Sequence, residues 1–141
     1  MIRFATAAAA LLLTAAPALA QTADNKVVLT FETGARTGMV MVALYDSATA
    51  FDGRNGAAVA QTAISASGRV VATFDNLPAG DYAVKAFHDV NGDGEMNTNP
   101  FGMPTEPYAF SNNAVGNMGP ARWDRAHFAV SGETAQTISI R

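Results

Sequence analysis

The chain contains no cysteine, and this absence narrows what the protein can be. No disulfide can stabilise the fold, no lipid can be attached to a cysteine behind a leader segment, and no thiolate can act as a nucleophile. The sequence also lacks a Gly-x-Ser-x-Gly elbow, a phosphate-binding loop and a His-Glu-x-x-His pair, which mark common hydrolases, nucleotide-binding enzymes and zinc proteases. We therefore expect a protein that is not an enzyme and whose stability comes from its core and from any ion that it binds.

The first twenty residues have the order of features found in a secretory signal peptide. Arg3 supplies a positive charge, residues 5–16 form an uncharged apolar run, and Ala18-Leu19-Ala20 follows Pro17 as a cleavage site. The apolar run is shorter than the about 20 residues that a transmembrane anchor needs. We expect residues 1–20 to be a signal peptide, residues 21–141 to form a single domain, and the protein to be periplasmic or secreted. The alternative is a buried N-terminal helix.

The charge balance bears on the kind of partner. Without Arg3 the chain would carry eight basic and twelve acidic residues, a formal charge of −4. This balance gives no electrostatic basis for binding nucleic acid. We expect neither a nucleic-acid partner nor a membrane anchor, and an envelope protein or a polysaccharide as the partner.

Short alternating segments separated by turn residues predict an all-β protein. Strands are expected at residues 26–33, 38–46, 59–65, 69–74, 81–90, 125–131 and 134–140. About seven strands without an amphipathic helix indicate one Ig-like or prealbumin-like antiparallel β-sandwich. Residues 91–123 are rich in Gly, Pro and Asn but also contain aromatic residues, so we expect one long ordered loop there.

The alternation also predicts which side chains form the core. The expected set is Leu29, Phe31, Val42, Leu44, Phe74, Tyr82, Val84 and Phe128. Residues 38–46 are apolar on both faces, as in a central strand that is covered on both sides. Met39, Met41 and Tyr45 could instead mark an exposed, adhesive face.

The turn between the fourth and fifth expected strands has a distinctive sequence. Phe74 and Leu77 anchor it in the core, Pro78 stiffens it, and Gly80 is expected to adopt a positive φ. Tyr82 follows, with a hydroxyl group that can bond to the turn backbone. This segment resembles the strand–turn–strand signature of transthyretin-like and carboxypeptidase-regulatory-like β-sandwiches.

A second resemblance covers nearly all of residues 26–141. The series His88-Asp89-x-Asn91-x-Asp93-Gly94, followed by residues 97–99 and 102–113, is similar to a bacterial family of small exported proteins known only as a domain of unknown function. The family more often has an aspartate where this chain has Asn97. The resemblance implies a fold and a compartment but no activity.

One part of the long loop has the spacing of a calcium ligand set. Oxygen-bearing side chains occur at Asp89, Asn91, Asp93 and Asn97, at positions 1, 3, 5 and 9 of an EF-hand-type loop, and Glu95 would contribute its backbone carbonyl. Gly94 stands where such a loop turns sharply. Position 12 is a proline rather than the usual bidentate glutamate, so we expect weak binding of calcium as a cofactor, with Glu106 as a possible remote ligand. The alternative is an empty turn.

Two other functions use the same loop. The aromatic residues Phe101, Tyr108, Phe110 and Trp123 could stack on sugar rings in a carbohydrate-binding module, with Asn112 and Asn113 as hydrogen-bonding groups. The alternative is that these rings form a small core beneath the loop. Asp89 and Glu106 could also form the carboxylate pair of a glycan-active enzyme.

The two histidines, His88 and His127, are expected to be packed side chains rather than zinc ligands.

Overall fold

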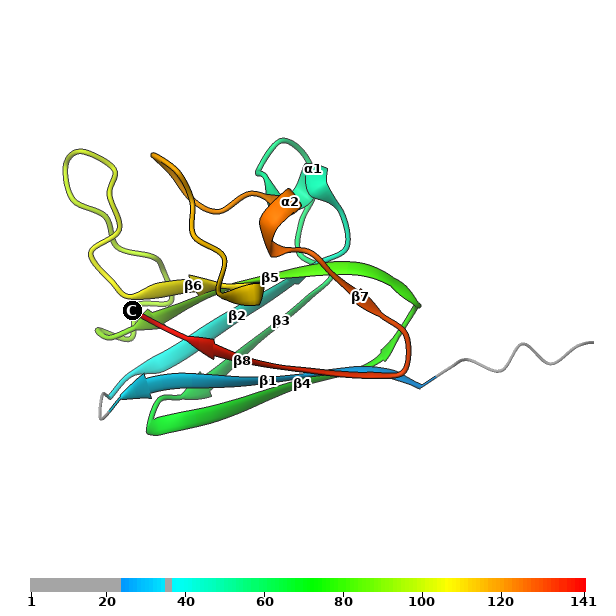
Figure 1. Ribbon diagram of the computed structural model, residues 1–141. Helices are drawn as coiled ribbons and strands as arrows, with labels where there is room; N and C mark the ends of the chain where they lie inside the picture. The colour runs from blue at the N-terminus through cyan, green and yellow to red at the C-terminus, as the bar shows by residue number, and fades with distance from the viewer. Residues whose placement is uncertain (1–23, 35–36) are drawn as a thin grey trace, which may run out of the picture.

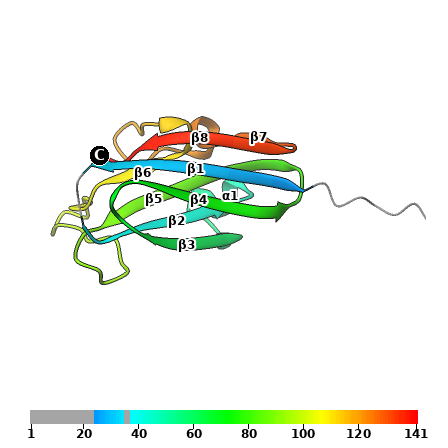
Figure 2. The same cartoon turned by 90° about the horizontal axis from the view of Figure 1, so that it is seen from below.

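Two β-sheets packed face to face form the protein, as the computed structural model of residues 24–34 and 37–141 shows (Figures 1 and 2). The expected signal peptide lies outside these described residues. In one sheet the strand order is β4 (Gly68–Leu77), β1 (Asn25–Gly34), β8 (Glu133–Ser139). In the other sheet the order is β3 (Ala60–Ser65), β2 (Met39–Tyr45), β5 (Gly80–Asp89), β6 (Tyr108–Phe110). The short strand β7 (Phe128–Val130) also pairs with β5. The expected all-β sandwich is confirmed, with eight strands in the described chain rather than seven.

Three points of the strand prediction need correction. β6 lies inside the segment that was expected to be irregular, and the expected strand at residues 125–131 begins only at Phe128, because Trp123–Ala126 form the helical turn α2. The remaining helical turns are α1 (Ala48–Phe51) and the 3-10 turn η1 (Ser111–Asn113). The sandwich is also not wholly antiparallel, since β1 and β8 run parallel.

No helix in the described part of the chain is long and apolar enough to cross a membrane.

The space between the sheets is filled by the side chains that the alternation predicted. Seven of the eight expected core residues are buried, and Phe128 is partly buried against the same cluster. The cluster also contains Val27, Val40, Val70, Ala72, Ala86, Val130, Ile138 and Ile140. A period of two places one face of each strand in this core, which explains why the strand prediction worked here.

The turn between β4 and β5 matches its prediction in one respect and differs in another. The Tyr82 hydroxyl donates to the Pro78 carbonyl oxygen at 2.7 Å, as expected. Gly80 does not have a positive φ; the left-handed residue is Asn76, with φ 56°. Asparagine tolerates this conformation because its short polar side chain bonds locally.

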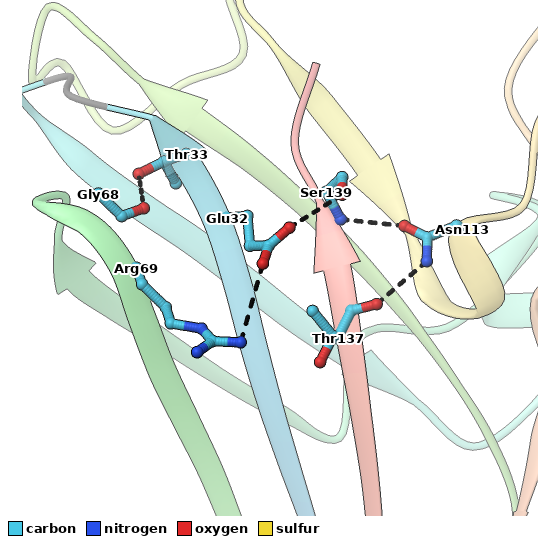
Figure 3. Close-up of polar contacts among 7 residues, drawn as sticks. All are labelled: Glu32, Thr33, Gly68, Arg69, Asn113, Thr137 and Ser139. Atoms are coloured by element: carbon cyan, nitrogen blue, oxygen red, sulfur yellow. Dashed lines mark hydrogen bonds and ion pairs between the residues drawn. The ribbon is translucent and has the colours of Figure 1, made fainter.

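The outer edge of β8 is closed by a side chain rather than by a strand. The Asn113 amide nitrogen donates to the Thr137 carbonyl oxygen at 3.0 Å, and the Asn113 amide oxygen accepts from the Ser139 N–H at 2.9 Å (Figure 3). This pair of bonds imitates the next strand of the sheet. An edge that is satisfied in this way is a poorer template for pairing with another chain.

The prediction for β2 was wrong about its second face. Val40, Val42 and Leu44 point into the core, whereas Met39, Met41, Ala43 and Tyr45 alternate with them and are only half-buried. Within the described residues no second sheet covers this outer face. The face lies between the two expectations, since its apolar side chains are neither fully covered nor fully exposed.

A second, smaller core covers one end of that outer face. Phe51, Ala83, Phe110, Ala121 and Ala126 are its buried members, and Tyr45, Ala114 and Trp123 pack against them. The Phe51 ring meets the Tyr45 ring edge-on, with centroids 5.5 Å apart, and contacts the Trp123 ring at 6.1 Å. This second core fixes α1 and α2 above the end of the five-stranded sheet (Figure 1).

Truncation of Phe74 tests the register of the main core. Phe74 is 7% exposed, and the Phe74→Ala variant should lose about 3–5 kcal/mol of unfolding free energy in urea melts. Val71 lies on the opposite face of the same strand and is 52% exposed, so Val71→Ala should change the stability by less than about 0.5 kcal/mol. Equal losses in the two variants would show that the face assignment of β4 is wrong.

Candidate functional site

Two buried carboxylates hold the base of the long loop. Asp89 ends β5, and its two carboxylate oxygens accept from the N–H groups of Gly92 and Gly94, both at 2.8 Å. Glu106 precedes β6 and accepts from the N–H groups of Val90 at 2.9 Å and Asn97 at 3.1 Å. Neither carboxylate forms an ion pair within the described residues. Four backbone N–H groups therefore satisfy two buried charges and fix the loop backbone in return.

The tip of the loop gathers the remaining residues of the expected calcium set. The Asn97 amide donates to Asp93 Oδ2 at 2.9 Å, and the Asn91 amide donates to Asp93 Oδ2 at 3.1 Å and to Asn97 Oδ1 at 2.9 Å. The hydrogen bond from Asn97 is the largest cause that lowers the pKa of Asp93. Glu95 is exposed, and its N–H donates to Asp93 Oδ1 at 2.9 Å. Gly94 has φ 80°, which fits its predicted place at the sharp turn.

These residues fit a cation in part. Asn91, Asp93 and Asn97 converge on one point, and the two ends of an asparagine amide exchange by rotation, so three side-chain oxygens can face that point. Asp89 lies at the loop base and has both oxygens bonded to backbone N–H groups. Among the described residues, no three His, Asp or Glu side chains gather around one position. Calcium binding here would therefore use amide and carbonyl oxygens besides carboxylates.

The four aromatic residues of the expected carbohydrate site do not form one surface. Phe110 is buried and Trp123 packs with it in the second core, which matches the alternative of a small core beneath the loop. Phe101 is 89% exposed at the loop tip, and Tyr108 is partly exposed on β6. Phe101 and Tyr108 are therefore the two of the four rings that are exposed.

The three polar residues after Phe110 are bonded to backbone. The Ser111 hydroxyl accepts from the Val84 N–H at 2.8 Å and donates to the Ala126 carbonyl oxygen at 2.6 Å, which fills the gap between β6 and β7 along the edge of β5. The Asn112 amide donates to the carbonyl oxygens of Arg125 and His127. Since Asn113 closes the edge of β8, all three side chains have structural bonds.

The histidines lie apart and in different surroundings. His88 is fully buried in β5, and its Nε2 donates to the Thr37 carbonyl oxygen at 2.6 Å. His127 is exposed and its ring stacks on Trp123, with centroids 5.6 Å apart. Both are packed or hydrogen-bonded side chains, as expected.

An apolar groove lies between the long loop and the outer face of the five-stranded sheet. Strand pairing aligns Ala63, Met41, Phe87 and Tyr108 in one row across the sheet, and Gln61, Ala43, Lys85 and Phe110 in the next row. Ala43 and Ala63 are small, so the centre of this face is hollow. Met96 and Met103 line the groove from the loop between β5 and β6, and Met118 lines it from the segment between η1 and α2. The volume of the groove is about 1240 Å³.

Sequence reasoning named only part of this groove. It identified Met41 and Tyr45 as candidates for an exposed apolar face and Tyr108 and Phe110 as candidate ligand-binding residues. It missed Lys85 and the methionines at positions 96, 103 and 118. A usable signal was present: three methionines, at positions 96, 103 and 118, fall within the Gly-, Pro- and Asn-rich residues 91–123. Methionine is enriched where a surface must adapt to an apolar partner.

The fold and this groove define a class: an all-β sandwich whose long, internally bonded loop covers an apolar hollow on one sheet. A family model described as "Uncharacterized protein conserved in bacteria (DUF2141)" matches residues 31–139, and the chain belongs to this family. A search of curated proteins and a search of solved structures found no match.

Substitution of Glu106 tests whether its carboxylate holds the loop. Glu106→Gln replaces one acceptor oxygen by a donor that faces a backbone N–H, and it should lower the unfolding free energy by about 1–3 kcal/mol. Hydrogen exchange of the Val90 and Asn97 amides should become faster. The exposed Glu95→Gln variant is the matched control, and identical exchange in the two proteins would contradict the assignment.

Proposed function

We propose that this chain is a non-catalytic, exported, transthyretin-like β-sandwich module that binds an apolar ligand in the groove beneath its long loop. The observation that carries the proposal is the groove itself. It has a volume of about 1240 Å³ and mostly apolar walls. This volume gives room for a small molecule, since typical sites for such ligands have about 300–1,000 Å³. Export rests on the signal-like residues 1–20, and the transthyretin-like character on the turn that Tyr82 and Pro78 close.

The groove exposes side chains that folding alone would bury. Met103, Met118 and Tyr108 all line the groove and are exposed, and Phe101 is exposed close by in sequence. Contiguous exposed apolar surface is disfavoured in water unless a partner covers it. The flexible thioethers of the methionines can repack around ligands of different shape, which supports binding rather than a purely structural role for the loop.

The arrangement of carboxylates supports a non-catalytic role. Asp89 and Glu106, the pair considered for glycan hydrolysis, each accept two backbone N–H groups and are buried. A general acid or a nucleophile must reach the substrate with a free oxygen. These two side chains serve the loop backbone instead.

Binding of a neutral fluorescent probe tests the groove. N-phenyl-1-naphthylamine should bind the full protein saturably, and Ala43→Phe, which fills the hollow, should weaken binding at least about tenfold, because the probe then loses its apolar contact area. Ala63→Phe at the rim is a second blocking variant. Ala135→Phe, at an exposed alanine of β8, is the matched control and should bind as the unchanged protein does. Unaltered binding by both blocking variants would exclude this groove as the site.

Calcium at the loop tip is a second candidate function. The observation that favours it is the convergence of Asn91, Asp93 and Asn97 at 2.9–3.1 Å. With no bidentate glutamate at position 12, the dissociation constant should be on the order of 10⁻⁴–10⁻³ M. Calcium would then strengthen the loop that covers the groove.

Thermal unfolding in calcium tests this candidate. Calcium at about 10 to 100 times its dissociation constant should stabilise the metal-stripped protein by about 1.4–2.7 kcal/mol. Magnesium should do less, because it holds its water more tightly. Asp93→Asn should remove the response while Asp89 still holds the loop base, and Asp75→Asn, at an exposed residue of β4, should keep it. A melting temperature that calcium does not change would leave the empty turn as the correct interpretation.

A further inference from the structure

Lys85 is the one residue that gives the groove a charge. It lies on the outer face of β5, in the row with Ala43 and Phe110, at the end of the groove next to the second core. Its ammonium nitrogen is 5.1 Å from the Tyr45 ring centroid and 4.8 Å from that of Phe51. Aromatic faces stabilise a cation at this distance but leave its charge available to an anion.

The charge of Lys85 has no carboxylate partner within the described residues. The chain has two lysines, and the other one, Lys26, pairs with Glu133 at 2.8 Å. The acid whose charge acts on Lys85 is Asp52, and Asp52 is already bonded to the Arg122 guanidinium and the Trp123 N–H, both at 3.1 Å. Burial lowers the pKa of Lys85. One partly desolvated positive charge therefore remains at the end of an apolar groove.

We propose that the groove binds a long-chain fatty acid, with its carboxylate at Lys85 and its acyl chain along the methionines. This inference rests on the proposed function and names the class of ligand. A carboxylate would supply the counter-charge that Lys85 lacks, in a partly buried setting where charge-assisted hydrogen bonds are strong. The acyl chain would cover Met41, Met96 and Met103.

The walls disfavour other ligands of the same size. A sugar would lose the hydration of its hydroxyl groups against methionine and proline side chains that cannot hydrogen-bond. A nucleotide brings several negative charges, and Lys85 is the only charged side chain on the groove walls within the described residues. A cationic amphiphile would place its head group beside an existing cation. A single carboxylate with an apolar tail matches one charge and an apolar surface.

Three probes with a twelve-carbon chain and different head groups test this inference by calorimetric titration. The two ionic probes are kept below their micelle-forming concentrations, and dodecanol is kept below its solubility limit. The full protein should bind dodecanoate about ten times more tightly than dodecanol, and dodecyltrimethylammonium least tightly. Lys85→Met keeps the length and apolar character of the side chain, and it should raise the dissociation constant of dodecanoate about 10- to 100-fold while dodecanol binds as before. Lys85→Gln should give the same loss if the methionine variant does not fold. Lys26→Met is the matched control and should change neither.

The outcomes separate the two proposals. If Lys85→Met and the unchanged protein bind dodecanoate equally while Ala43→Phe binds neither dodecanoate nor dodecanol, the groove binds apolar ligands and the fatty-acid assignment is overturned. If Ala43→Phe binds both probes normally, the ligand site lies elsewhere and both proposals fail. Loss of the preference for dodecanoate in Lys85→Met alone supports the assignment.

Discussion

The shape of the site depends on two buried carboxylates that accept hydrogen bonds from the backbone. Asp89 and Glu106 each accept two N–H groups from the long loop, so the loop has a fixed path over the outer face of the sheet. A buried carboxylate without partners is strongly unfavourable, and four N–H donors remove most of that penalty. This loop places Met96 and Met103 along the groove, and Met118 reaches the groove from the segment between η1 and α2.

The outer face of the five-stranded sheet is divided between two kinds of cover. At one end the second core buries Phe51 of α1 together with Phe110, and at the other end Met41 and Phe87 line the groove with residues of the loop. Small side chains at Ala43 and Ala63 separate these two regions. Lys85 lies at the boundary, where aromatic rings stabilise its charge. The apolar walls partly desolvate this charge, so a nearby anion would stabilise it. This juxtaposition is the basis of the proposed site for an amphiphile.

The sequence predicted the parts of the fold that depend on local patterns. Alternation identified the inward residues of β1, β4 and β5, since a strand buried on one face shows its period directly. It did not reveal β6, whose three residues lie between Pro107 and Ser111. It also did not reveal the outward face of β2, because an apolar run looks alike whether a layer or a loop covers it. Lys85 could not be recognised as a site residue, since its importance comes from rings and methionines that are distant in sequence.

The most direct test of acyl binding in the groove is methyl-resolved NMR of protein labelled at methionine. Met41, Met96, Met103 and Met118 line the groove, whereas Met39 lies on the same strand as Met41 but outside it. Titration with dodecanoate should shift the four groove methyl signals and give contacts between them and the acyl chain, while the Met39 signal stays in place. Contacts at Met39 without contacts at the groove methyls, or no shift at any methionine at saturating dodecanoate, would contradict the assignment of the groove as the binding site.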